Sequence, residues 1–139
     1  MKVEKRGQQR GFTLIEMLVV LVLISLLAGL VGPKLFNKVG SSKTKVASAQ
    51  IELFSSALNT YRLDVGDYPT TEQGLPALMS APGSAVGWDG PYLAKDVPAD
   101  PWGKAYMYKL KDNGDFALYT LGKDGKEGGT GENEDIGVF

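Results

Sequence analysis

An apolar run from Phe12 to Val31 constrains this chain more than any other feature of its sequence. Its polar or small interruptions are Thr13, Glu16, Ser25 and Gly29. A helix of about 20 apolar residues is long enough to cross the hydrocarbon core of a bilayer. The sequence therefore predicts a membrane-spanning helix, and the carboxylate of Glu16 within it needs a functional reason because a charge in lipid is costly.

Charge is distributed unevenly around this run. Residues 1–11 carry four basic side chains and one acidic one, a net charge of +3, so the total of −1 leaves −4 for residues 12–139. Four lysines follow the apolar run closely, so the positive-inside rule does not fix its orientation. The mildly acidic remainder lacks the concentrated basic face of nucleic-acid-binding proteins, and we expect no nucleic-acid partner.

The sequence contains no Cys and no His. Disulfides therefore cannot stabilise the fold, and the commonest general base, the usual zinc ligands and every Ser–His or Cys–His pair are missing. Two pairs of neighbouring carboxylates, Asp96 with Asp100 and Asp112 with Asp115, are better explained by turns. We therefore predict that the chain is not an enzyme.

A second helical pattern follows the apolar run. Spacings of three and four residues put one stripe of side chains on a single helix face: Ala47, Ile51, Phe54, Leu58, Tyr61 and Val65. Such a stripe requires something to pack against, and Gly66 followed by Asp67-Tyr68-Pro69 is typical of a helix end. The sequence predicts one helix from Phe12 to Val65 whose second half packs on the rest of the chain.

Pro33 interrupts this predicted helix together with Gly29 and Gly32. Its nitrogen has no proton to donate to the carbonyl of Gly29, and its ring crowds that carbonyl. Two interpretations stay open: a gentle kink at the membrane edge, or a segment that melts when subunits assemble.

The remaining residues predict a long loop and a small sheet. Residues 68–101 are rich in Pro and Gly, with one helical turn expected at 75–79. Residues 106–110 and 116–120 resemble strands, joined by a hairpin turn at 112–115. Four side chains are expected to pin the loop to the core: Trp88, Tyr92, Leu93 and Trp102. The Gly-rich, acidic tail from Gly122 predicts no regular structure.

Several segments resemble known families. Residues 10–20, with Gly11-Phe12-Thr13-Leu14-Ile15-Glu16 at their centre, resemble the processing signal of type IV pilins and type II secretion pseudopilins. Residues 67–75, 100–108 and 121–129, followed by Asp135-Ile136, resemble the major pseudopilins, or G subunits, of the type II secretion system. Together these segments span nearly the whole chain.

The resemblance implies an α+β, type IV pilin-like fold. Its long N-terminal helix spans the membrane with its first half and packs with its second half on a small antiparallel sheet. The implied organisation is a cleaved leader (1–11), a transmembrane and assembly helix (12–32) and a periplasmic domain (33–139) that includes the amphipathic half of the helix. The expected location is the inner membrane, as a single-pass protein with its C-terminal domain in the periplasm.

The same resemblance implies a structural subunit of a periplasmic filament, the pseudopilus, that helps to export folded proteins across the outer membrane. The expected partners are other copies of the chain, minor pseudopilins, the prepilin peptidase, the inner-membrane secretion platform and membrane lipid. The peptidase would cut between Gly11 and Phe12 and methylate the new amine of Phe12. We expect Glu16 and Pro33 to serve assembly, since a carboxylate in lipid needs a positive partner and the amine of a neighbouring subunit would supply it. The alternative for Glu16 is a side chain that snorkels to the interface.

The C-terminal loop from Gly122 to Asp135 holds five glycines and five acidic residues. From the residues alone, a solvated acidic loop and a Ca²⁺ site both stay open, because the spacing is not that of an EF-hand. The resemblance implies bound Ca²⁺, with Leu121 contributing its carbonyl and Asp124, Glu132 and Asp135 their carboxylates. The ion would then stabilise a region that lacks a disulfide.

Two other functions compete with this interpretation, a type IVa pilin and a membrane-tethered periplasmic enzyme, and the enzyme would need a nucleophile–base pair or one of the carboxylate pairs above. A type IVa pilin for adhesion or motility has a similar N-terminus, but many such pilins close their C-terminal region with a disulfide that this chain cannot form. An uncleaved N-terminal anchor would explain the apolar run and would make Glu16 accidental.

Overall fold

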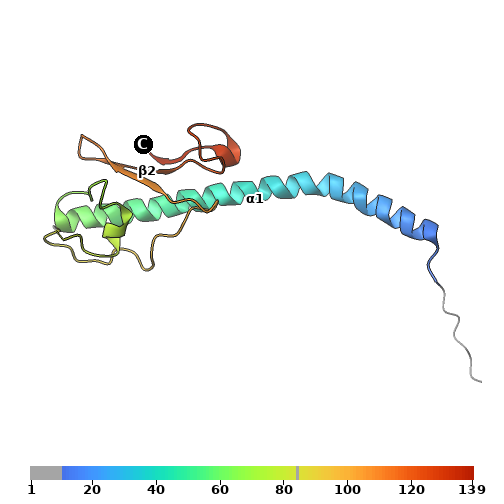
Figure 1. Ribbon diagram of the computed structural model, residues 1–139, viewed down its shortest axis with the longest axis horizontal. Coiled ribbons are helices and arrows are strands. Elements are labelled where there is room, and N and C mark those ends of the chain that lie inside the picture. Colours follow the sequence, from blue (N-terminus) through green and yellow to red (C-terminus); the bar gives the residue numbers. More distant parts are fainter. Residues whose placement is uncertain (1–10, 84) are drawn as a thin grey trace, which may run out of the picture. The chain divides into compact units, whose positions relative to one another are not determined.

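The computed structural model describes residues 11–83 and 85–139. It contains one long helix, two short 3₁₀ helices and three strands (Figure 1): α1 (Leu14–Val65), η1 (Leu75–Leu78), β1 (Met107–Leu110), β2 (Phe116–Thr120), η2 (Gly131–Asn133) and β3 (Ile136–Val138). The chain divides into two compact units, Met1–Lys38 and Val39–Phe139. The α+β fold class expected from the sequence is confirmed.

Helix α1 begins at Leu14, two residues after the predicted start, and continues without interruption through Pro33. Its most apolar stretch has a mean hydropathy of 2.9, and none of that stretch is buried within the chain. Among the described residues, α1 is the one helix whose length and composition suit a membrane span. It ends as predicted, because Gly66 adopts a φ of 104° and its N–H donates to the carbonyl of Arg62 at 2.8 Å.

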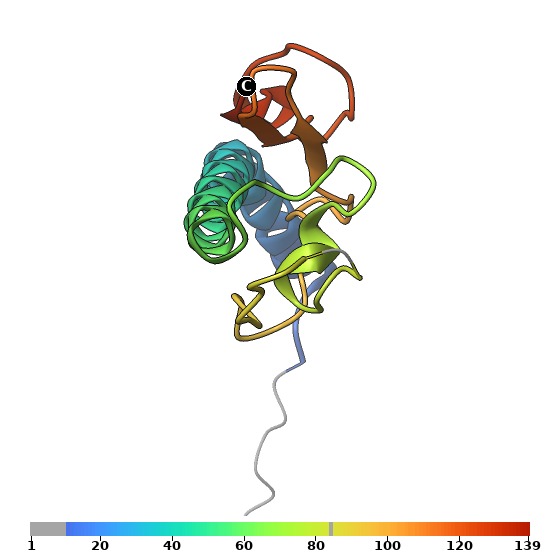
Figure 2. The ribbon, with the colours of Figure 1, turned by 90° about the vertical axis from the view of Figure 1, so that its left-hand side faces the viewer.

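The core of the second unit forms along the predicted stripe of α1. Val65 packs against the edge of the core. The other five stripe residues are buried: Ala47, Ile51, Phe54, Leu58 and Tyr61. Figure 2 looks along the helix and shows the sheet and η1 beside it. Phe54 meets the ring of Tyr106 edge-on, with centroids 5.3 Å apart. The stripe therefore docks the loop and the sheet, as its spacing indicated.

The sheet is antiparallel in the order β1-β2-β3. Along β2, Phe116, Leu118 and Thr120 are buried and alternate with half-buried residues, as expected for a strand with one face on the core. The predicted hairpin turn is present, since the N–H of Lys111 donates to the carbonyl of Asp115 at 2.8 Å. The structure confirms both predicted strands, the first starting one residue later.

Two expectations about the loop regions were wrong. The tail from Gly122 includes η2 and β3, because residues 136–138 pair with the open edge of β2, a contact that local composition does not reveal. Trp102 is half-buried and lies outside the core, whereas Leu93 is buried and Trp88 and Tyr92 pack against the core as expected. The predicted helical turn near residue 75 is η1.

Candidate functional sites at the helix start and the C-terminal loop

The predicted cleavage point lies in exposed chain without regular structure, just before α1. Phe12 is 81% exposed, and a Cβ added at Gly11 would meet no atom within 4 Å. A protease requires accessible backbone without regular structure, and this junction provides it. The basic part of the predicted leader, residues 1–10, lies outside the described residues.

Glu16 forms a capping box with Thr13 at the start of α1. Its Oε2 accepts the N–H of Thr13 at 2.8 Å and the hydroxyl at 3.1 Å, and its own N–H donates to Oγ1 of Thr13 at 3.3 Å. The pair satisfies donors that a helix start leaves open. Sequence reasoning missed this role, although the Thr-x-x-Glu spacing was visible. Glu16 thus has a structural task within one chain in addition to the assembly role expected of it.

All four predicted calcium ligands lie in the C-terminal loop or directly before it. Leu121 follows β2 directly, and Asp124 accepts the N–H of Lys126 at 3.1 Å. Asp135 accepts the N–H of Gly128 at 2.8 Å with Oδ2, while its Oδ1 is buried without a hydrogen-bond partner. A buried acceptor without a donor is unfavourable unless something unseen satisfies it. A cation on the carboxylate of Asp135 would do so.

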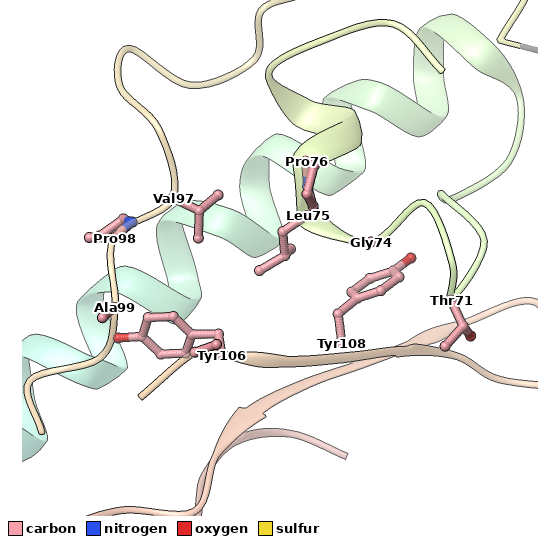
Figure 3. Close-up of a pocket in the computed structure, with 10 residues that line it drawn as sticks. Thr71, Gly74, Leu75, Pro76, Val97, Pro98, Ala99, Tyr106 and Tyr108 are labelled. Atoms are coloured by element: carbon pink, nitrogen blue, oxygen red, sulfur yellow. The ribbon is translucent and has the colours of Figure 1, made fainter. Parts of the chain in front are cut away.

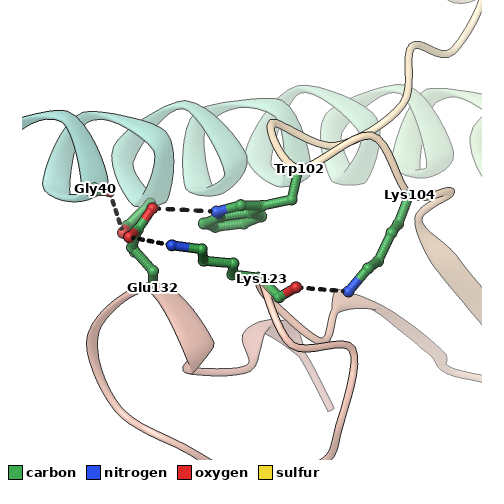
Figure 4. Close-up of polar contacts among 6 residues, drawn as sticks. Gly40, Trp102, Lys104, Lys123 and Glu132 are labelled. Atoms are coloured by element: carbon green, nitrogen blue, oxygen red, sulfur yellow. Dashed lines mark hydrogen bonds and ion pairs between the residues drawn. The ribbon is translucent and has the colours of Figure 1, made fainter. Parts of the chain in front are cut away.

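The fourth predicted ligand, Glu132, points elsewhere (Figure 4). Its Oε1 accepts the indole N–H of Trp102 at 3.4 Å, and its Oε2 pairs with the ammonium of Lys123 at 3.3 Å. The hydrogen bond from Trp102 and then that from Lys123 lower the pKa of Glu132. Among the described residues, no three acidic side chains gather into a metal-binding group. Asp124 and Asp135 accept backbone N–H groups of the loop, whereas Glu132 is engaged with Trp102 and Lys123.

A glycine in α1 permits the position of Glu132. Gly40 is buried, and a Cβ added there would lie 2.7 Å from Cγ of Glu132. The loop therefore contacts the helix where the helix lacks a side chain. Sequence reasoning missed this contact; its available signal was a glycine inside a helix that does not end there.

Asp100 organises the turn that carries Trp102. This carboxylate is only 4% exposed. Its Oδ1 accepts the N–H groups of Trp102 at 3.0 Å and Lys104 at 2.8 Å, and its Oδ2 accepts the hydroxyl of buried Thr120. All of these contacts lie within the fold, so Asp100 links the turn to the end of β2. The interpretation of this acid as a turn residue is confirmed.

An open pocket of about 420 Å³ lies between β1 and the preceding loop (Figure 3). The hydroxyl of Tyr108 donates to the carbonyl of Pro69 at 2.8 Å, and that of Tyr106 donates to Gln50. Burial, with the charge of Asp100 adding to it, raises the pKa of Tyr106 to about 12. Among the described residues, no charged side chain lines the pocket, and its two phenols donate hydrogen bonds within the fold.

Two family models match the chain. The Prokaryotic N-terminal methylation motif matches residues 6–32, and Type II secretion system (T2SS), protein G, matches residues 34–139. The chain belongs to the protein G family. Members of this family are structural pseudopilin subunits, which confirms that the chain is not an enzyme and favours the secretion system over the type IVa pilus.

Similar proteins of this family match almost the whole chain. The type II secretion system core protein G of Pseudomonas aeruginosa is 43% identical over 137 residues, with 96% of both chains covered. That of Vibrio cholerae is 41% identical over 138 residues, with 96% of this chain and 94% of the relative covered. The crystal structure of the major pseudopilin from the type 2 secretion system of enterohaemorrhagic Escherichia coli matches with a TM-score of 0.61 and 31% identity, over 76% of this chain and 93% of that chain. The type IV pilin-like fold is therefore shown.

Proposed function

We propose that this protein G is the major subunit of a type II secretion pseudopilus. The main support is the order of the two matches, since the N-terminal methylation motif is followed directly by a protein G domain. Cleavage between Gly11 and Phe12 would release a subunit that begins with its membrane-spanning helix. The first half of α1 would anchor the subunit in the inner membrane, with residues 33–139 in the periplasm.

The exposed apolar surface of α1 supports polymerisation. The most apolar window of the helix buries nothing within its own chain, and so large an apolar surface needs a cover in water. Membrane lipid would cover it before assembly, and the helices of other copies would cover it in the filament. The other partners in this proposal are the prepilin peptidase, the minor pseudopilins and the inner-membrane secretion platform.

The proposal is tested by deleting the gene and complementing it. The deletion strain should retain type II secretion substrates in the periplasm, and the wild-type gene should restore their export. Overexpression should produce filaments whose helical reconstruction contains this chain. Normal secretion together with lost surface adhesion or motility would instead identify a type IVa pilin.

We propose that the C-terminal loop holds a calcium ion. Carboxylates of Asp124 and Asp135 and the carbonyl of Leu121 are hard oxygen ligands of the type that Ca²⁺ prefers, and the unpartnered buried oxygen of Asp135 supports the assignment. Glu132 would join them only by leaving Trp102 and Lys123. The ion would neutralise the loop's carboxylates and stabilise the folded state by binding to it alone.

Calorimetry of the full chain in detergent tests the calcium site. Excess EDTA should lower the melting temperature, and CaCl2 should restore it. Asp135→Asn should abolish this response, whereas Glu127→Gln, an exposed acid in the same loop, should keep it. A wild-type melting temperature that is the same with EDTA and with CaCl2 would exclude a structural ion.

A further inference from the structure

The ammonium group of Lys104 contacts the start of the C-terminal loop. Its Nζ donates to the carbonyl of Lys123 at 2.9 Å and to that of Gly122 at 3.3 Å (Figure 4). These carbonyls belong to the segment that leads from β2 into the loop. Lys104 reaches them from 18 and 19 residues earlier in the sequence.

The backbone of Lys104 is held by Asp100, and the loop passes close to the ammonium at its other end. Two hydrogen bonds join Lys104 to Asp100. The backbone N–H of Lys104 donates to Oδ1 of Asp100 at 2.8 Å, and the backbone N–H of Asp100 donates to the carbonyl of Lys104 at 2.7 Å. On the loop side, Gly125 has a φ of 68°, and a Cβ added there would lie 2.6 Å from Nζ of Lys104. The loop thus passes close to the ammonium at a position without a side chain.

An ammonium group is suited to hold this loop. It has three donors and no acceptor, so it can bind several inward-facing carbonyls at once. Hydrogen bonds from a charged donor are stronger than neutral ones. Gly-rich segments lose much conformational entropy on ordering, so a loop of this composition needs such a contact to keep one conformation.

We propose that Lys104 is a built-in cation of the C-terminal loop. Its ammonium binds the carbonyls of Gly122 and Lys123 and keeps the loop folded when no metal ion is bound. The expected effect of Ca²⁺ on this loop rests on the proposed calcium site, whereas the role of Lys104 without the ion does not. With Ca²⁺ present, two cations share the task, and loss of one is less damaging.

Thermal unfolding of the full chain in detergent with excess EDTA tests this proposal. Lys104→Met keeps the apolar stem and removes the charge, and it should lower the melting temperature by about 5 °C. Lys126→Met removes a charge from an exposed position of the same loop and should change it by less than about 1 °C. Lys104→Arg retains a cationic donor and should recover part of the loss.

Hydrogen exchange of residues 121–135 in EDTA provides a local readout. These amides should exchange faster in Lys104→Met than in Lys126→Met, while those of the α1 stripe should remain equally protected. Adding CaCl2 should reduce the difference between the two variants. Equal melting temperatures and equal loop exchange of the two variants in EDTA would overturn the proposal. A wild-type protein that ignores CaCl2 would refute the calcium site alone, since the comparison in EDTA does not involve the ion.

Discussion

Carboxylates in this chain have roles that depend on their surroundings. Asp100 is buried and bonded to donors from the turn and from β2. Glu132 is half-exposed between an indole and an ammonium, and Asp135 keeps one buried oxygen without a partner. Each acid was visible in the sequence, but its partners come from distant segments. Composition therefore identified the acidic loop and not the task of each acid in it.

The lowered pKa of Glu132 predicts a pH dependence of stability. A folded pKa below the ordinary value of 4.5 means that the ionised form stabilises the fold above that pH. This contribution should be lost as the pH falls from 4.5 through the folded pKa. Melting temperatures of wild type and Glu132→Gln should therefore differ at neutral pH and converge in acid. A constant difference across this range would contradict the assignment.

Gly11 should control processing. A bulky Gly11→Val replacement should leave the precursor uncleaved, because the peptidase must approach the backbone closely at this point. Intact mass of the purified protein checks this, with Gly7→Val as the control that changes a glycine away from the junction. A wild-type mass that still includes Met1 would refute cleavage between Gly11 and Phe12.

At the level of elements, short sequence patterns predicted the features that depend on neighbouring residues alone. The spacing of the α1 stripe and the Asp-Asn-Gly-Asp turn lie within short windows, and both were correct. Strand β3 and the contacts of Lys104 and Glu132 join residues far apart in the sequence, so no window contains them. Trp102 was misplaced for the same reason, since Glu132 lies 30 residues further along the chain.

The α1 stripe should carry much of the stability of the second unit. Leu58 is fully buried, and Leu58→Ala should cost about 2–5 kcal/mol because it removes packed methyl groups and leaves a cavity. Leu63 in the same helix is 85% exposed, so Leu63→Ala should cost less than about 0.5 kcal/mol. Denaturant unfolding of both variants measures this difference, and equal losses would contradict the described packing.

Pro33 lies within a continuous helix in the single chain. The predicted melting concerns the assembled filament, so it has to be tested there. A helical reconstruction of the filament should show missing backbone hydrogen bonds around Gly29 to Pro33. Pro33→Ala, which restores the missing N–H, should give continuous helix at the same place. Unbroken helical density in wild-type filaments would leave only the kink.

At the scale of the whole molecule, we expect Glu16 to be needed for filament assembly and not for membrane insertion. Glu16→Ala should be cleaved and inserted normally but yield few filaments, because the partner for the neighbouring amine is gone. Thr13→Ala is the matched control, since it breaks the capping box and keeps the carboxylate. Filament yields on sheared cells measure both variants. Equal yields from Thr13→Ala and Glu16→Ala would assign Glu16 to the helix start alone.

The contact between Trp102 and Glu132 has a practical consequence for spectroscopy. The sequence contains two tryptophans, and Trp88 donates its indole proton to the carbonyl of Ala77, away from the C-terminal loop. A Trp88→Phe protein would therefore carry a single tryptophan, which can be excited apart from the tyrosines and is hydrogen-bonded to a carboxylate of that loop. Its emission would report the state of the loop without any attached dye, in detergent and in intact filaments alike.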